Sequence, residues 1–138
     1  MSIAMKMTSS LRRSSRPLGM VAAPLVALLV WLAADPLAGI DLAVRRGAGA
    51  VQNLGPVDVI IAALAAGLAA WGLRAVLDRV SDRSRTVWTA VAVAVLLVSL
   101  VGPLTGAMTV TATIVLECMH VAVGASLIAA LAPGVTST

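Results

Sequence analysis

The sequence predicts an all-α membrane protein: an antiparallel up-down bundle of four transmembrane helices with both termini in the cytoplasm. Composition is the first observation behind this prediction, because 60% of the 138 residues are hydrophobic and only 12% are charged. A soluble domain carries about 25% charged residues. The second observation is a set of four apolar runs, each close to the roughly 20 residues that a helix needs to cross a bilayer. The third is the placement of the basic residues, which flank those runs.

The four spans are expected at residues 18–34, 57–77, 87–104 and 110–131. Together they form one transmembrane domain over residues 17–132, since a chain of this length has room for one domain. A basic tail, residues 1–16, precedes the domain and is expected to be disordered. A short cytoplasmic tail, residues 133–138, follows it.

Residues at the ends of the runs support these limits. The first run is interpreted as an uncleaved span, because the large Trp31 stands where a small residue would precede a signal-peptide cleavage site. Asp35 and Pro36 end this span, since proline disfavours helix at the residue before it. Gly55 and Pro56 open the second run, where proline suits the first position of a helix.

The distribution of lysine and arginine predicts the orientation. Four basic residues precede the first run: Lys6, Arg12, Arg13 and Arg16. Four more lie at the end of the second run and in the connection after it: Arg74, Arg79, Arg83 and Arg85. The first connection holds only Arg45 and Arg46. Segments rich in lysine and arginine stay in the cytoplasm, so both termini are expected inside. The excess of arginine over lysine is typical of GC-rich bacteria and indicates a bacterial plasma membrane.

Two connections show patterns of their own. Residues 35–56 have a weakly alternating core with a glycine-rich centre (IDLAVRRGAGAVQNLG), which predicts a small β-hairpin. Residues 73–86 keep helical spacing and are expected to extend the second span toward the lipid headgroups. The four arginines around this extension are candidate contacts for anionic lipid, with a plain topology signal as the alternative role.

Small residues are expected to bring the helices together, because helices in a bilayer associate by close approach rather than by the hydrophobic effect. They are abundant in span two: Ala62, Ala63, Ala65, Ala66, Gly67, Ala69, Ala70 and Gly72. The same residues could serve a homo-oligomer or a partner protein in the membrane, and both alternatives stay open. Nucleic acid is not expected as a partner, since the basic residues flank apolar runs instead of gathering with aromatic residues.

The last span contains the main candidate site. Glu117 and His120 lie three positions apart in an otherwise uncharged run, so they share one face of a helix. A carboxylate in hydrocarbon costs roughly 2.5–3.5 kcal/mol on insertion scales, which makes such a residue a functional candidate. With Thr113 and Gly124, they form a stripe that we expect to face the bundle. The candidate polar site, opening outward, comprises Glu117, His120, Thr113, Asp35 and Asp58.

Two roles are open for this stripe. A pair formed by Glu117 and His120 can relay a proton or bind a cation, whereas a purely structural role would have it fix helix packing through hydrogen bonds. No metal or other cofactor is expected, because a zinc site usually needs three or four ligands. Cys118 does not complete such a site with Glu117 and His120, because it points about 100° away from Glu117 on a helix. A haem held by two histidines would need a second chain, since the chain has one histidine.

Three segments carry a resemblance to a known family: WLAADPLAGIDL at the end of span one, GPLT after span three, and MHVAVGASLI in span four. They resemble a family of small four-span membrane proteins from high-GC Gram-positive bacteria that is known as a domain of unknown function. The resemblance implies four spans and a plasma-membrane location. The family has no assigned activity, so the resemblance implies no catalytic residue.

The leading hypothesis for function is a non-enzymatic accessory or structural protein of the plasma membrane, because the polar set is too sparse for catalysis. The alternative is a proton- or cation-coupled carrier of a small solute that uses the polar pocket around Glu117 and His120. A weaker alternative is a haem or redox subunit that uses His120 across a dimer.

Overall fold

The computed structural model describes residues 18–132, so the predicted tails at both ends of the chain lie outside the described residues. Within this range, four helical segments are long and apolar enough to cross a membrane: Leu18–Leu37, Pro56–Val80, Ser84–Gly106 and Val110–Leu131. Their number and order agree with the predicted spans, although three of the four reach further than the sequence suggested.

The first helix, Leu18–Leu37, continues three residues past the predicted end at residue 34. Its last five residues, Ala33–Leu37, form a wide π-helical turn (η1) that contains Pro36. The amide of Gly39 then donates to the carbonyl of Asp35 over 2.9 Å, and this bond closes the helix end. The prediction that Asp35 and Pro36 end the span is therefore too early, because both lie inside this last turn and the helix ends at Leu37.

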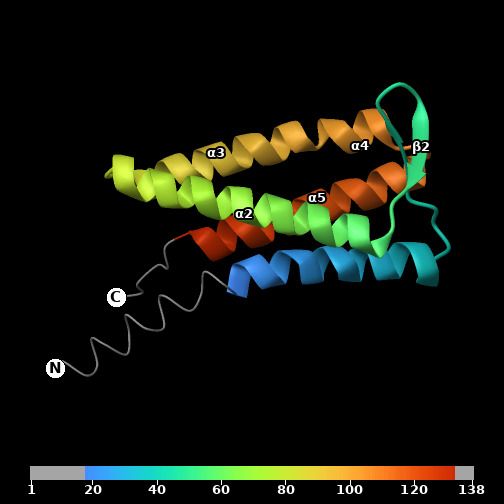
Figure 1. Cartoon of the computed structure of the whole chain (residues 1–138), viewed down its shortest axis with the longest axis horizontal. Coiled ribbons are helices and arrows are strands. Elements are labelled where there is room, and N and C mark those ends of the chain that lie inside the picture. Colours follow the sequence, from blue (N-terminus) through green and yellow to red (C-terminus); the bar gives the residue numbers. More distant parts are fainter. Residues whose placement is uncertain (1–17, 133–138) are drawn as a thin grey trace.

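The predicted hairpin is confirmed in the first connection. Strands β1 (Ala43–Arg46) and β2 (Ala50–Asn53) pair antiparallel, with Val44 opposite Gln52. Gly47 and Gly49 have φ angles of 53° and 101°, which residues with a Cβ rarely adopt. The glycine-rich centre therefore forms the turn. Figure 1 shows the hairpin across one end of the helices, opposite the α2–α3 connection.

The second helix, α2, runs from Pro56 to Val80, so proline occupies its first position as expected. Asp58 accepts a hydrogen bond from the amide of Gly55 at 3.0 Å and stabilises the helix start. The helical extension predicted over residues 73–86 is present as far as Val80. A short turn follows, and α3 (Ser84–Ser99) begins three residues before the predicted span.

The third span differs most from the prediction, because it consists of two helices and extends from Ser84 to Gly106 instead of over residues 87–104. Helix α3 ends at Ser99, and a separate helix, α4 (Val101–Gly106), continues along it. Pro103 is buried in the first turn of α4. Amide groups in the first turn of a helix have no acceptor within that helix, so the amide proton that proline lacks costs no helical hydrogen bond there. The proline thus marks the start of a second segment rather than the end of the span.

The last helix, α5, runs from Val110 to Leu131 and agrees with its prediction. Two core clusters hold the helices together. The first contains Ala27 of the first helix, Val59 and Ala63 of α2, and Met119 of α5. The second contains Ala34, Leu42 and Ala112, beneath the hairpin. Small residues dominate both clusters, as close approach of helices in a membrane requires.

Candidate functional site

The face of α5 that carries Glu117 and His120 is turned toward α3. A Cβ on Gly124, which lies on the same face, would come within 2.6 Å of Cδ1 of Leu96 on α3. Glycine therefore allows α3 and α5 to approach closely at this point. Thr113, Glu117 and His120 are all half-buried, so the stripe lies partly inside the bundle.

The polar members of this stripe bind their own helix rather than one another. Thr113 donates its hydroxyl to the carbonyl of Thr109 at 3.0 Å. Nδ1 of His120 lies 2.8 Å from the carbonyl of Leu116. A carbonyl can only accept, so Nδ1 of His120 is the donor in this hydrogen bond. Oε1 of Glu117 is buried and has no hydrogen-bond partner among the described residues.

A groove runs along the bundle next to this stripe, with a cavity volume of about 620 Å³. One wall is α2, the other is formed by α3 and α4, and α5 forms the floor. His120 lines the groove, whereas Glu117 and Thr113 are not among its lining residues. The lining on α2 extends from Asp58 to Leu73. At 1.5 Å rise per residue, this is about 22 Å, most of the roughly 30 Å thickness of a hydrocarbon core.

The small residues of α2 divide into two groups. Some do pack against other helices, since Ala63 is 5% exposed and belongs to the first core cluster. Ala62, Ala66 and Ala69 are instead exposed and line the groove. The small side chains therefore leave space beside α3 as well as bringing helices together.

The polar groups of the groove gather at the end covered by the hairpin. Asp58 of α2 lines this end together with Arg45 and Arg46 of β1. The carboxylate of Asp58 is held by two donors, the amide of Gly55 at 3.0 Å and the side-chain amide of Gln52 at 3.3 Å. Its position is therefore fixed by the start of α2 and by β2.

Only part of the predicted polar pocket is thus assembled. His120 and Asp58 line one groove, but Glu117 and Asp35 are not among its lining residues. Asp35 lies in η1, at the end of the first helix. Among the described residues, no group of three or more histidine, cysteine, aspartate or glutamate side chains could hold a metal ion.

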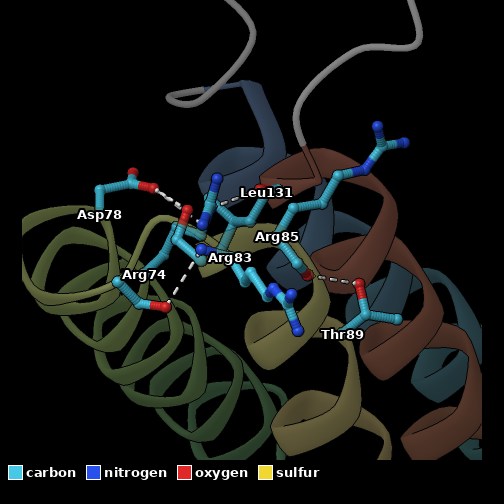
Figure 2. Close-up of polar contacts among 8 residues, drawn as sticks. Arg74, Asp78, Arg83, Arg85, Thr89 and Leu131 are labelled. Carbon is cyan, nitrogen blue, oxygen red and sulfur yellow. Dashed lines mark hydrogen bonds and ion pairs between the residues drawn. The ribbon is translucent and has the colours of Figure 1, made fainter.

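Sequence reasoning missed the role of Arg74 at the other end of the bundle. Its side chain is only 4% exposed, in contrast to those of Arg79, Arg83 and Arg85, which belong to exposed residues. Nε of Arg74 donates to the carbonyl of Leu131 at 3.1 Å, and Nη1 lies 2.8 Å from Oδ1 of Asp78. Figure 2 shows Arg74 between these two partners. The helical spacing of Arg74 and Asp78 was the available signal, but nothing in the sequence indicated Leu131.

A family model described as "Family of unknown function (DUF6069)" matches residues 8–137, nearly the whole chain. The match agrees with the resemblance of the three sequence segments to a family without assigned activity. No curated protein and no solved structure matches the chain.

Proposed function

The chain belongs to the DUF6069 family, whose function is unknown, and from its geometry we propose that it is a non-enzymatic lipid-binding protein of the plasma membrane. In this proposal the groove between α2 and α3 holds one acyl chain of a membrane lipid. The observation that carries it is the groove itself, a hollow of about 620 Å³ within the apolar part of the bundle. Ligand sites commonly have volumes of about 300–1,000 Å³.

The shape and lining of the groove favour an acyl chain. Its length along α2, about 22 Å, exceeds the roughly 15 Å that one leaflet contributes to the hydrocarbon core. Its walls are mostly alanine, valine and leucine, and α2 presents exposed alanines along its edge. In a bilayer, lipid chains are the surrounding solvent and fill any hollow that opens to the side of a protein.

The few polar groups of the groove favour binding over catalysis. Ser99 donates its hydroxyl to the carbonyl of Leu96, within its own helix, over 2.7 Å. His120 is held by the carbonyl of Leu116. Nucleophilic catalysis needs a hydroxyl or thiol within reach of a base. The hydroxyl of Ser99 and the ring of His120 are instead hydrogen-bonded to carbonyls of their own helices, so they do not form such a pair.

The proposal includes an up-down arrangement in a bacterial plasma membrane, with both termini in the cytoplasm. Lysine and arginine support this orientation, since four precede the first span and four lie at or near the α2–α3 connection. The hairpin would then lie outside the cell, with Arg45 and Arg46 near the outer leaflet. Arg79, Arg83 and Arg85 would lie on the cytoplasmic side as topology signals. In contrast, Arg74 is engaged inside the bundle.

A proton-coupled carrier is the second candidate, and the observation that favours it is the position of His120 on the floor of the groove. Proton flux and solute uptake in proteoliposomes test it. A carrier that uses this site would lose flux in Glu117→Gln and His120→Gln, whereas a lipid-binding protein would show no flux above empty liposomes in any variant.

Native mass spectrometry of the full chain, released from detergent micelles, tests the lipid-binding proposal. We expect the wild-type protein to retain one phospholipid. Ala66→Phe places a large ring in the groove and should remove that lipid. Ala65→Phe is the matched control, because Ala65 is exposed on the same helix but does not line the groove.

Three results would contradict the proposal. The wild-type chain could retain no lipid, or Ala66→Phe could retain as much lipid as Ala65→Phe. The third is a dimer mass that disappears in Ala66→Phe alone, which would identify a second copy of the chain as the occupant. Circular dichroism and size exclusion of both variants show whether each has folded.

A further inference from the structure

The end of the groove under the hairpin carries two arginines with no ion-pair partner among the described residues. Arg45 and Arg46 are both exposed and both line the groove. Asp58 is the one acidic residue among the described residues that line the groove. Its two oxygens already accept from Gln52 and Gly55. The groove therefore ends in an excess of positive charge.

The hairpin is fixed to the bundle, so these two charges have a defined place. The amide of Met108 donates to the carbonyl of Ala43 at 3.0 Å, and Val44 forms a β-bridge with Ala107. Within the hairpin, the amide of Leu54 after β2 donates to the carbonyl of Leu42 before β1 at 2.9 Å, which continues the pairing of the two strands. The segment that leads from α4 to α5 thus holds β1 against the mouth of the groove.

From this arrangement we propose that the groove selects a net-negative phospholipid, with the headgroup phosphate at Arg45 and Arg46 and one acyl chain between α2 and α3. This inference rests on the proposed lipid-binding function and adds the charge of the headgroup. Arginine suits the site because its planar fork of N–H donors matches phosphate oxygens.

The orientation supplies a further reason for a ligand at this end. Arginines on the cytoplasmic side act as topology signals, but arginines on the outer side oppose the positive-inside rule. In the proposed orientation, Arg45 and Arg46 are therefore basic residues without a topological role. A headgroup phosphate at the outer leaflet would neutralise them at the point where the apolar groove begins.

The test is competitive native mass spectrometry on the full chain in detergent. Phosphatidylglycerol and phosphatidylcholine with identical acyl chains are added in equal amounts, so only the headgroup differs. We expect the wild-type protein to prefer phosphatidylglycerol by about 25-fold, since each of the two arginines near an anionic lipid contributes roughly 1 kcal/mol, about fivefold. The double variant Arg45→Gln/Arg46→Gln should bind both lipids equally while still retaining one lipid.

The matched control is Arg79→Gln/Arg83→Gln, which removes two exposed arginines at the opposite end of α2. It should keep the wild-type preference, and added inorganic phosphate should not bind in place of the lipid. Equal binding of the two lipids by the wild type would overturn the inference, as would a preference that survives in Arg45→Gln/Arg46→Gln or vanishes in the control. In those cases lipid is still retained and the proposed function stands, whereas a wild-type chain without lipid overturns both.

Discussion

The guanidinium of Arg74 binds the carbonyl of Leu131, 57 residues further along the chain, over 3.1 Å. Leu131 is the last residue of α5, where unpaired carbonyls carry the negative end of the helix dipole. The same guanidinium pairs with Asp78, which also accepts a hydrogen bond from Ser84 at the start of α3. The buried arginine therefore joins α2 to α5, and its partner Asp78 joins α2 to α3 (Figure 2).

Replacing Arg74 by methionine should destabilise the fold, because the carbonyl of Leu131 loses a charged donor. A hydrogen bond to a charged group contributes about 1.5–3 kcal/mol, and we expect a loss of that size. Thermal unfolding in detergent micelles measures it, with Arg79→Met as the control, since Arg79 is exposed on the same helix. Equal midpoints for the two variants would show that the Arg74–Leu131 contact contributes nothing.

Trp31 makes the corresponding contact at the hairpin end. Its Nε1 donates to the carbonyl of Leu54 at 2.8 Å and joins the first helix to the segment before α2. Trp31→Phe keeps the apolar ring but leaves a partly buried carbonyl without its donor, which should cost about 1–3 kcal/mol. Trp71→Phe is the control, because the side chain of Trp71 is 46% exposed. If the two substitutions lower the unfolding midpoint equally, the hydrogen bond of Trp31 is not stabilising.

The contrast between Arg74 and the hairpin indicates how far sequence reasoning extends. Hydropathy predicts the spans because each apolar run must cover the same membrane thickness. Gly47 and Gly49 predict the hairpin because the turn needs positive φ angles at both positions. The role of Arg74 depends on which helix end lies beside it, and a local pattern holds no information about a residue 57 positions away.

The groove escaped prediction for a related physical reason. Whether an alanine on α2 closes a helix contact or leaves a hollow depends on the side chains of α3 and α5 opposite it. Ala63 and Ala66 have the same side chain one turn apart and both line the groove, yet Ala63 is buried in a helix contact and Ala66 is exposed. The break at Pro103 shows the same limit, since proline is compatible both with the end of one helix and with the first turn of the next.

Gly19 should not tolerate a side chain, because a Cβ there would clash with the Cβ of Ala130 on α5. We expect Gly19→Ala to lower the unfolding midpoint, since overpacking typically costs 1–3 kcal/mol. The double variant Gly19→Ala/Ala130→Gly restores the space and should recover most of the loss. Gly72→Ala is the control, because no atom lies within 4 Å of a Cβ built there. A loss in Gly72→Ala as large as that in Gly19→Ala would contradict this account of the contact.

Glu117→Gln should not reduce stability and is expected to raise the unfolding midpoint slightly. Oε1 of Glu117 is buried without a hydrogen-bond partner, and a neutral amide is less costly to bury than a carboxylate. Thermal unfolding at neutral pH measures the effect. As a comparison, His120→Ala removes a ring that contacts the groove and the carbonyl of Leu116, and should lower the midpoint. A marked loss of stability in Glu117→Gln would instead show that the carboxylate has a stabilising partner.

The proposed orientation predicts opposite chemical accessibility for the two ends of α2. Cys118 is the only native cysteine, so Cys118→Ala gives a background without thiols. In that background, Ala48→Cys adds a thiol to the exposed hairpin turn, and Asp82→Cys adds one to the exposed α2–α3 connection. A membrane-impermeant maleimide applied to intact cells should label Ala48→Cys, and should label Asp82→Cys only after permeabilisation. The reverse pattern would place Arg45 and Arg46 in the cytoplasm. In that case the two arginines would act as ordinary topology signals, and they would not lie at the outer leaflet.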